Sequence, residues 1–378
     1  MLLSNAFDPD PRVHQEATAL VNSGYDVTIL CWDRDLKRPA FEVIDGISVE
    51  RIYVKSTHGR GTSQLLFLFL FWLKAYARSF KRRFQIIHCH DFDTLPLGFL
   101  ISKYKNAKLV YDAHESYVDM LVNVPSWLKK TIYRFENWFL RRIHLLITVG
   151  EILRETLEKR GAKNTCVVGN WKDPARFEFP KTTLKEEKKR LGISDDQLVI
   201  SFIARLTEER QLPRLIEAIK DTSRVFLLIG GDGPYMETAK DAARRYSNVC
   251  FLGFVNPRDV PLYTAISDAI FYGFDPGNRN SNFSAPNKLF EALAAGKAII
   301  TGNFGEIGRI VKETDSGLIL KDYSAEEITN TLSQLDPMVL QMYGKNARNA
   351  ALACYSWDKA SHILLKQYEV LVQKASPC

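Results

Sequence analysis

A carboxylate in the second half of the chain has the position and type to bind sugar hydroxyls. Glu291 lies in a helix that the sequence predicts from Pro286 to Gly296, because proline suits a first helical turn and glycine a helix end. Helical side chains lean toward the helix start, where free N–H groups favour an anion. Glu291 can therefore accept hydrogen bonds from a ribose whose diphosphate lies at that end. The alternative is an ordinary ion pair with Lys288, one turn away.

Two arginines follow the apolar run 198–203, which predicts a buried strand. Arg205 and Arg210 lie between this strand and the next predicted helix. Fixed cations at that position would stabilise the negative charge that develops on a departing diphosphate. The alternative is that they form loop salt bridges with Glu208 or Glu209. The next strand ends in the turn 230–234, which reads either as a tight strand-to-helix connection or as a phosphate cradle without the lysine of a P-loop.

Alternating apolar strands and amphipathic helices must position these residues. The pattern predicts parallel sheets covered on both faces, with strands at 27–31, 47–54, 86–89, 109–112, 145–149, 198–203, 225–229, 249–252, 269–272, 298–301 and 317–320. It loosens near Asp173. We therefore expect an α/β protein with one Rossmann-like domain over residues 1–172 and a second over 173–355, facing a cleft, and a helical segment 356–378 that packs back on the first domain.

Composition indicates a folded protein, with 46% hydrophobic and 25% charged residues among 378. Six scattered cysteines without a C-x-x-C pair predict neither a zinc knuckle nor a disulfide framework, and favour a reducing cytoplasm. The N-terminus shows no pattern of a cleavable signal, and the longest apolar run, 65–73, is too short to span a bilayer.

The net charge of +7 is uneven, because residues 51–150 hold 16 Lys and Arg but 6 Asp and Glu. Such a surplus attracts anionic partners. The segment 127–143 places apolar residues along one helical face and basic residues elsewhere, so it predicts either a helix on an anionic membrane or a core helix with a solvated basic face. The same choice holds for 65–73. We favour peripheral attachment to the inner face of the membrane and a lipid-carried acceptor.

Four segments together resemble the family 4 retaining glycosyltransferases of GT-B fold: Ala204-Arg205-Leu206, the turn 230–234, the segment 248–254, and 286–291. Segments of the first half are also similar to the family, including His88-Cys89-His90-Asp91 and Tyr111-Asp112-Ala113-His114-Glu115. The resemblance covers nearly the whole chain. It implies transfer of a sugar from a nucleoside diphosphate, UDP or GDP, to an acceptor hydroxyl with retention of configuration, in cell-surface polysaccharide or glycolipid synthesis.

The resemblance also assigns residues. Arg205 and Arg210 would hold the diphosphate, and Glu291 the ribose, while His114 would reach the donor sugar near the reaction centre. The backbone near Phe254 would meet the base. The diphosphate or sugar hydroxyls would be contacted by Ser284, Ala285, Pro286 and Asn287. In the family's usual scheme the departing phosphate itself takes the proton of the incoming hydroxyl.

Three departures from the family pattern bear on substrate. Phe283 stands where the family often has a first glutamate, so the donor sugar is not specified. Ala204 replaces a glycine, and Asn5 to Asp10 replaces a Gly-rich loop on the acceptor side. Phe283 also keeps open a non-catalytic scaffold, and a sugar-nucleotide epimerase would need more acid-base residues than His114 and its neighbours provide.

No metal or cofactor is expected. The acidic triplets 33–35 and 91–93 lie outside the predicted donor domain, and the arginines already supply positive charge. His88 and His90 are expected to face opposite sides of their strand, which would exclude a joint zinc site. Nucleic acid is not expected as a partner, because the chain lacks the interleaved basic and aromatic motifs of the usual binding modules.

Overall fold

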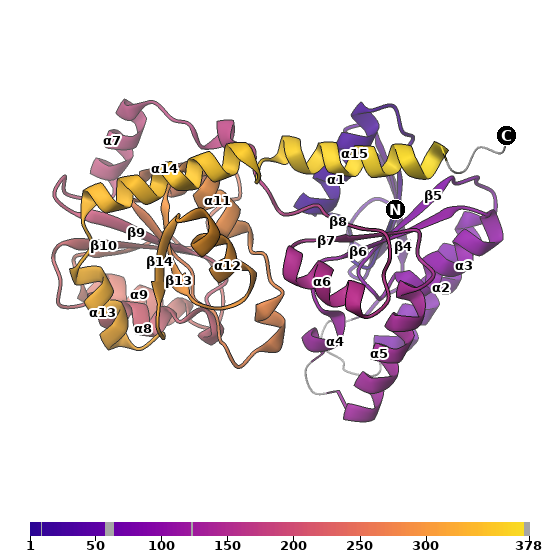
Figure 1. The fold of residues 1–378 in the computed structure, drawn as a ribbon, viewed down its shortest axis with the longest axis horizontal. Coiled ribbons are helices and arrows are strands. Elements are labelled where there is room, and N and C mark those ends of the chain that lie inside the picture. The colour runs from indigo at the N-terminus through magenta and orange to yellow at the C-terminus, as the bar shows by residue number, and fades with distance from the viewer. Residues whose placement is uncertain (9, 57–63, 122–123, 374–378) are drawn as a thin grey trace. The chain divides into compact units, whose positions relative to one another are not determined.

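The computed structural model describes residues 1–8, 10–56, 64–121 and 124–373. The chain forms two compact units, Met1–Gly169 with Ala360–Cys378, and Asn170–Lys359. Their boundaries lie a few residues from those predicted at 172/173 and 355/356. Each unit has its own largely parallel sheet with helices on both faces (Figure 1), as the alternating pattern predicts.

The first sheet has the order β3-β4-β2-β1-β5-β6-β7-β8. All neighbouring pairs are parallel except β3 with β4. The strands are β1 (Leu2–Leu3), β2 (Thr28–Asp33), β3 (Phe41–Ile44), β4 (Ile47–Tyr53), β5 (Ile86–His90), β6 (Lys108–Ala113), β7 (Leu145–Thr148) and β8 (Thr165–Val167). Three short strands, β1, β3 and β8, are not among the eleven predicted from sequence.

The helices of the first unit are α1 (Pro11–Asn22), α2 (Gln64–Ser79), α3 (Leu95–Lys105), α4 (Tyr117–Met120), α5 (Ser126–Leu140) and α6 (Glu151–Lys159). Helix α1 begins at Pro11, because the Asp10 carboxylate accepts hydrogen bonds from the N–H groups of Arg12 and Val13. Helix α15 (Trp357–Gln373) ends the described chain, and its residues from Ala360 onward group with the first unit. Residues 374–378 of the predicted C-terminal segment lie outside the described residues.

The second sheet has the order β11-β10-β9-β12-β13-β14 and is wholly parallel. Its strands are β9 (Leu198–Ile203), β10 (Val225–Gly230), β11 (Val249–Phe251), β12 (Ala269–Phe271), β13 (Ala298–Gly302) and β14 (Gly317–Leu320). The strand order reverses between β9 and β12. In open parallel sheets a ligand binds beyond the carboxyl ends of the strands at such a point.

The helices of the second unit cover both faces of this sheet (Figure 1). They are η2 (Pro174–Phe177), α7 (Lys181–Arg190), η3 (Glu208–Arg210), α8 (Leu212–Ile219), α9 (Met236–Arg245), α10 (Val260–Ile266), η4 (Arg279–Asn282), α11 (Asn287–Ala295), α12 (Gly305–Thr314), α13 (Ala325–Ser333) and α14 (Pro337–Ala353). Strands β9 and β10 are buried along their entire length, as expected for the centre of a doubly covered sheet. Among the described helices, none is both long and apolar enough to cross a membrane.

Candidate active site

Three loops of the second unit are joined at the carboxyl ends of neighbouring strands. The Ala204 N–H donates to the Gly230 carbonyl at 3.0 Å, and the Gly231 N–H donates to the Gly253 carbonyl at 2.7 Å. Gly231 has a φ of +135°, and a Cβ there would lie 1.9 Å from the Ala204 carbonyl oxygen. The glycine turn is therefore required for close packing against the loop that carries Arg205, whichever ligand it also contacts.

Arg205 is exposed in this loop, directly beyond β9. The described residues provide neither hydrogen bond nor ion pair for its guanidinium. Glu209 accepts instead from the Asn278 side chain at 3.3 Å. Among the described residues, Arg205 therefore forms no salt bridge with Glu208 or Glu209, and its guanidinium faces solvent.

Arg210 is held against two aromatic rings beyond β12. Its guanidinium carbon lies 4.7 Å from the ring centre of Tyr272 and 4.8 Å from that of Phe274. Its Nη1 atom is buried and has no hydrogen-bond partner among the described residues. A buried, unpaired charged donor is unfavourable, typically by about 1–3 kcal/mol or more. An anion at this edge of the sheet would satisfy it.

Glu291 lies in α11 and forms an ion pair with Lys288, with Nζ and Oε2 2.5 Å apart. Both side chains are largely buried. The ordinary ion pair considered from the sequence is thus present, but in an environment less solvated than a typical helix surface. Pro286 is the N-cap of α11 rather than its first helical residue, and Gly296 ends the helix in the left-handed region as predicted.

The segment before α11 is fixed by residues at the start of the second unit. The Asn170 side chain donates to the Ala285 carbonyl at 3.0 Å, and Lys172 Nζ donates to Asn287 Oδ1 at 2.6 Å. Ala285 is buried, whereas Ser284 and Pro286 are half-buried and Asn287 is exposed, so the two polar side chains among the proposed contacts are accessible. Phe254, beyond β11, is 71% exposed, which is unusual for a large apolar ring.

A second polar group lies at the carboxyl ends of β5 and β6 in the first unit. Parallel pairing places His90 beside Asp112. Asp112 Oδ2 lies 3.2 Å from His90 Nδ1 and 3.0 Å from His114 Nε2. Arg12 completes the group from α1, because its Nε and Nη2 atoms donate to the two carboxylate oxygens at 3.0 and 2.8 Å.

Two carboxylates control the charge of His114. Burial alone would lower its pKa, but Asp91 and Asp112 outweigh burial and raise the pKa to about 9. Asp91 Oδ2 lies 3.4 Å from His114 Nδ1. Asp112 is buried as well, yet Arg12 and His114 hold its pKa well below the usual range. His114 is thus a half-buried imidazolium at neutral pH, oriented by two carboxylates.

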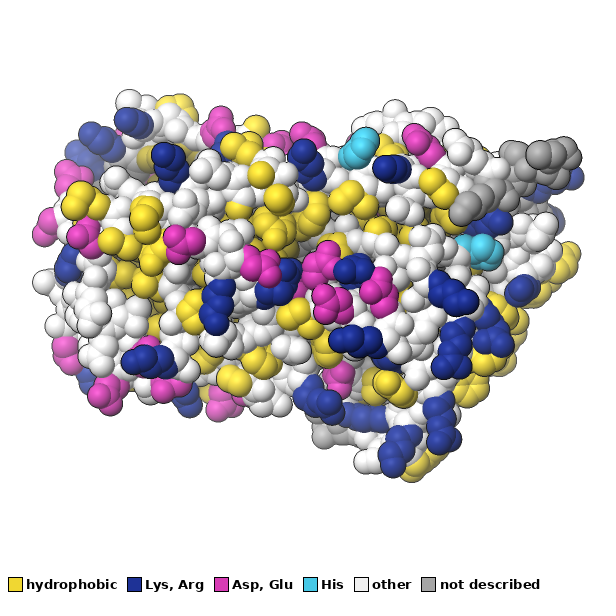
Figure 2. Space-filling model, viewed as in Figure 1, with side chains coloured by type: hydrophobic (Ala, Val, Ile, Leu, Met, Phe, Trp, Pro, Cys, Tyr) yellow, Lys and Arg dark blue, Asp and Glu magenta, His cyan; other side chains and the backbone are white. Residues whose placement is uncertain are grey.

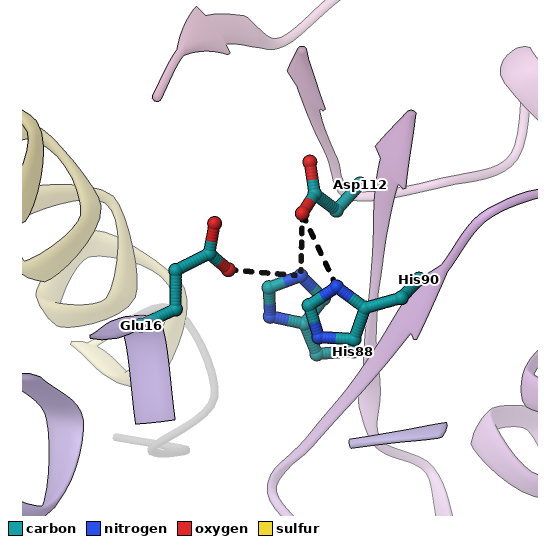
Figure 3. Close-up of side chains that lie close together, drawn as sticks. All are labelled: Glu16, His88, His90 and Asp112. Carbon is teal, nitrogen blue, oxygen red and sulfur yellow. Dashed lines mark hydrogen bonds and ion pairs between the residues drawn. The ribbon is translucent and has the colours of Figure 1, made fainter. Parts of the chain in front are cut away.

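His88 and His90 lie on the same side of β5, so the prediction that they face opposite sides is wrong. Residues two apart along a strand share a face, and only adjacent residues alternate. Their rings stack with centres 4.4 Å apart. Figure 3 shows both rings next to Asp112, with Glu16 on the far side of His88.

Glu16, His88, His90 and Asp112 therefore form a group whose ligand atoms lie within 4.8 Å of one another (Figure 3). Such a set could hold a metal ion. Arg12, however, already supplies the positive charge, since its Nη2 also lies 3.0 Å from Glu16 Oε1. Burial raises the pKa of Glu16 to about 8, and burial lowers the pKa of His88. Glu16 and both histidines nevertheless keep buried atoms without a hydrogen-bond partner among the described residues. The expectation that no metal binds therefore stays a prediction.

The acidic triplets occupy other positions. Asp33 uses its carboxylate to accept from the N–H groups of Asp35, Leu36 and Arg38. Asp91 turns through the left-handed region at a φ of +61° and contacts His114. Among the described residues, neither triplet belongs to a group that could hold a metal.

Arg12 and Glu16 are functional candidates that the sequence reasoning did not identify. They lie one turn apart on α1, and both point toward the core. The available signal was their spacing of four residues next to the apolar residues Val13 and Ala17, because it puts two charged side chains beside a helical face that must be buried.

Two family models match the chain. The model described as "Glycosyl transferase 4-like domain" matches residues 9–171, and the model described as "Glycosyl transferases group 1" matches residues 183–350. The α-monoglucosyldiacylglycerol synthase of Acholeplasma laidlawii is 24% identical over 74% of this chain and 74% of its own.

Solved structures share the fold. Sucrose-phosphate synthase from Thermosynechococcus elongatus has a TM-score of 0.80 at 18% identity, covering 99% of this chain and 98% of its own. Anabaena Alr3699/HepE in complex with UDP-glucose has a TM-score of 0.73 at 16% identity, covering 98% of each chain. The motifs at both sheet edges, the two family matches and the shared fold lead to one conclusion: this chain belongs to the group 1 glycosyltransferases of GT-B fold.

Proposed function

We propose that the chain transfers a sugar from a nucleoside diphosphate to an acceptor hydroxyl, with retention of anomeric configuration. The observation that carries the proposal is the pair of arginines at the switch point of the second sheet. Arg205 has no partner among the described residues, and Arg210 presents a buried Nη1 without one. Both arginines follow β9, and the two rings that contact Arg210 follow β12, the hydrogen-bonded neighbour of β9.

The proposed roles follow from chemistry. Arg205 and Arg210 bind the diphosphate and stabilise its charge as the bond to the sugar breaks. Glu291 exchanges its ion pair with Lys288 for the vicinal hydroxyls of the ribose. Phe254 and its backbone contact the base, while Ser284 and Asn287 bind oxygens of the diphosphate or sugar. His114, whose two N–H groups face Asp91 and Asp112, exchanges the longer contact, to Asp91, for a hydrogen bond to the sugar being transferred.

The acceptor we propose is a lipid-linked or saccharide hydroxyl in cell-surface polysaccharide or glycolipid synthesis. The name of the Acholeplasma relative, a glycolipid synthase, supports this choice, and the HepE complex with UDP-glucose supports UDP-glucose as the first donor to test. The departing phosphate oxygen accepts the proton of the incoming hydroxyl on the same face of the sugar, so the chain itself provides position and charge rather than a separate base.

A panel of UDP- and GDP-sugars incubated with the purified protein tests the proposal through release of the nucleoside diphosphate. The anomeric configuration of the product, read by NMR, tests retention. We expect one donor to be turned over and its configuration to be kept. A protein that binds no nucleotide would be a scaffold of this fold, and an interconverted but untransferred sugar would indicate an epimerase.

Glu291→Ala should weaken nucleotide binding about tenfold, because a carboxylate that accepts two hydroxyl donors contributes roughly 1–3 kcal/mol. Isothermal titration with UDP and GDP measures this. Glu237→Ala is a matched control, since Glu237 forms the same kind of ion pair with Lys240 three residues away on an exposed helix. Equal affinities for wild type and the Glu291 variant would remove the ribose role.

A further inference from the structure

Three helices form one continuous layer on the first unit. Helices α2 and α3 meet through Tyr76 and Tyr104, whose ring centres are 6.3 Å apart. Helices α3 and α5 meet through Phe99 and Trp138, with ring centres 5.1 Å apart. We call this layer, with the residues that follow α2 and α5, the α2–α3–α5 surface. It combines segments that are distant in the sequence.

The outward side of this layer is apolar. In α2, Leu66 is 62% exposed and Phe69 is 51% exposed, while Leu68 and Phe71 pack inward. The helix is thus apolar on both sides, which water does not favour. The exposed large apolar residues of the layer are Leu65, Leu66, Phe69, Leu70, Leu73, Phe80, Leu100, Tyr104, Trp127, Tyr133, Phe135 and Trp138.

The charge of the layer is of one sign. Neither α2 nor α3 contains Asp or Glu, and the single acidic residue of α5, Glu136, is buried and paired with Arg160. Basic residues surround the apolar side chains: Lys74, Arg78, Lys81, Arg83, Lys103, Lys105, Lys129, Lys130, Arg134, Arg141 and Arg142. Figure 2 shows dark-blue and yellow side chains together over this part of the first unit.

Cations and aromatic rings are in direct contact on this surface. The Arg142 guanidinium carbon lies 3.9 Å from the ring centre of Trp138, and Lys105 Nζ lies 4.9 Å from that of Tyr104. Tryptophan, tyrosine, arginine and lysine are the residues that occupy the boundary between lipid headgroups and acyl chains, because each combines an apolar body with a polar end.

We propose that the α2–α3–α5 surface binds an anionic lipid bilayer. Leucine and phenylalanine side chains enter the acyl region, and the surrounding Lys and Arg side chains contact acidic headgroups. A bilayer is the occupant that matches both observations, since a protein partner of ordinary polarity would leave most of these cations unpaired and a nucleic acid would leave the leucines in contact with water. The inference rests on the proposed function only for its consequence, that the acceptor is a lipid taken from the same bilayer.

Flotation of the full chain with vesicles tests the proposal. We expect binding to vesicles of equal phosphatidylglycerol and phosphatidylcholine at low salt, and little binding to pure phosphatidylcholine. Replacing Arg134 or Lys130 by glutamine should weaken the partition coefficient about fivefold for each charge removed. Phe69→Ser and Leu73→Ser should each weaken it by about tenfold or more.

Met338→Ser and Leu352→Ser are matched controls, because these apolar side chains are also exposed but belong to the second unit. They should bind vesicles as wild type does. Thermal unfolding followed by circular dichroism confirms that each variant is folded. Equal binding to neutral and anionic vesicles, or unchanged binding of both the Phe69 and Leu73 variants, would overturn the proposal.

Two further outcomes distinguish lipid binding from dimerisation and from the proposed function. The wild-type protein could form dimers and not bind vesicles, while the Phe69 variant stays monomeric. That result would assign the surface to a second copy of the chain and contradict lipid binding. Nucleotide affinity should be equal in all these variants. If wild type bound vesicles but no nucleotide, the proposed function would fail while the lipid surface stood.

Discussion

The carboxyl ends of the two sheets hold opposite kinds of charge arrangement. In the first unit Arg12, Asp112 and His114 satisfy one another in a buried group. In the second unit Arg205 and the Nη1 atom of Arg210 have no partner among the described residues. From this difference we expect the first group to stabilise the folded unit and the second to bind an anion from outside the chain.

Asp112→Ala should have the largest effect, on stability. It leaves the Arg12 guanidinium buried without its carboxylate, which typically costs about 3–5 kcal/mol. Urea unfolding followed by circular dichroism measures the loss. Asp241→Ala, which breaks an exposed pair with Arg244, and Arg205→Ala should each change stability by less than about 0.5 kcal/mol. Similar losses for Asp112→Ala and Arg205→Ala would break the comparison between the two edges.

Arg210→Gln should have the next largest effect, on turnover. Removal of a cation that stabilises the departing diphosphate lowers kcat about 10²- to 10³-fold, or roughly 2.7–4 kcal/mol. Arg210→Lys keeps the charge and should lose less than about tenfold, although it gives up the stacking on Tyr272 and Phe274. Arg244→Gln, on an exposed helix, is the control. A lysine variant as inactive as the glutamine variant would show that geometry rather than charge dominates.

The pH dependence of stability should report the protonation of His114 and Glu16 in the first unit. Because the folded state raises the pKa of His114 to about 9, it binds a proton that the unfolded chain releases near pH 6.5. Its contribution is complete below pH 6.5 and is lost as pH rises to about 9, by up to roughly 1.4 kcal/mol per pH unit. Burial raises the pKa of Glu16 to about 8, so this carboxyl adds a further loss of stability as pH rises toward 8.

Burial lowers the pKa of His88 and of His90, so their effect has the opposite sign. These two rings should lower stability as pH falls below about 6.5, because there the histidines of the unfolded chain bind protons and the buried rings of the folded chain do not. Unfolding at a series of pH values should therefore show a loss of stability between pH 6.5 and 9, whereas below pH 6.5 the two rings and the carboxyls of Glu16 and Asp93, whose pKa values burial raises, act in opposite directions. His114→Gln should flatten the curve between pH 8 and 9, and an unchanged slope there would rule out an imidazolium at this position.

Chelation should have the smallest effect. With arginines supplying positive charge in the second unit and Arg12 in the first, we expect turnover in EDTA to stay within about twofold of that in buffer. Elemental analysis of the purified protein extends the test to the Glu16 group. Turnover lost in EDTA and restored by manganese, or a stoichiometric metal that Glu16→Gln removes, would contradict the charge argument.

Local patterns predicted most of the fold. Each of the eleven strands expected from sequence is present within a few residues, because a parallel strand that is buried on both faces consists of consecutive apolar residues. Of the three strands outside these eleven, β1 has two residues, and β3 and β8 are short edge strands. Strand β3 alternates exposed and half-buried residues, so its pairing with β4 rather than its own sequence defines it. Family motifs identified the loops that carry Arg205 and Glu291.

The sequence by itself determined which elements form and which charged residues follow the strand ends, because both depend on neighbours along the chain. Only the tertiary structure decided which charges are neutralised. The partners of Asp112 include Arg12, 100 residues away, and the rings behind Arg210 follow a strand more than 60 residues later. Whether a buried charge is satisfied or open depends on such contacts, since desolvation and ion pairing are set by distance in space.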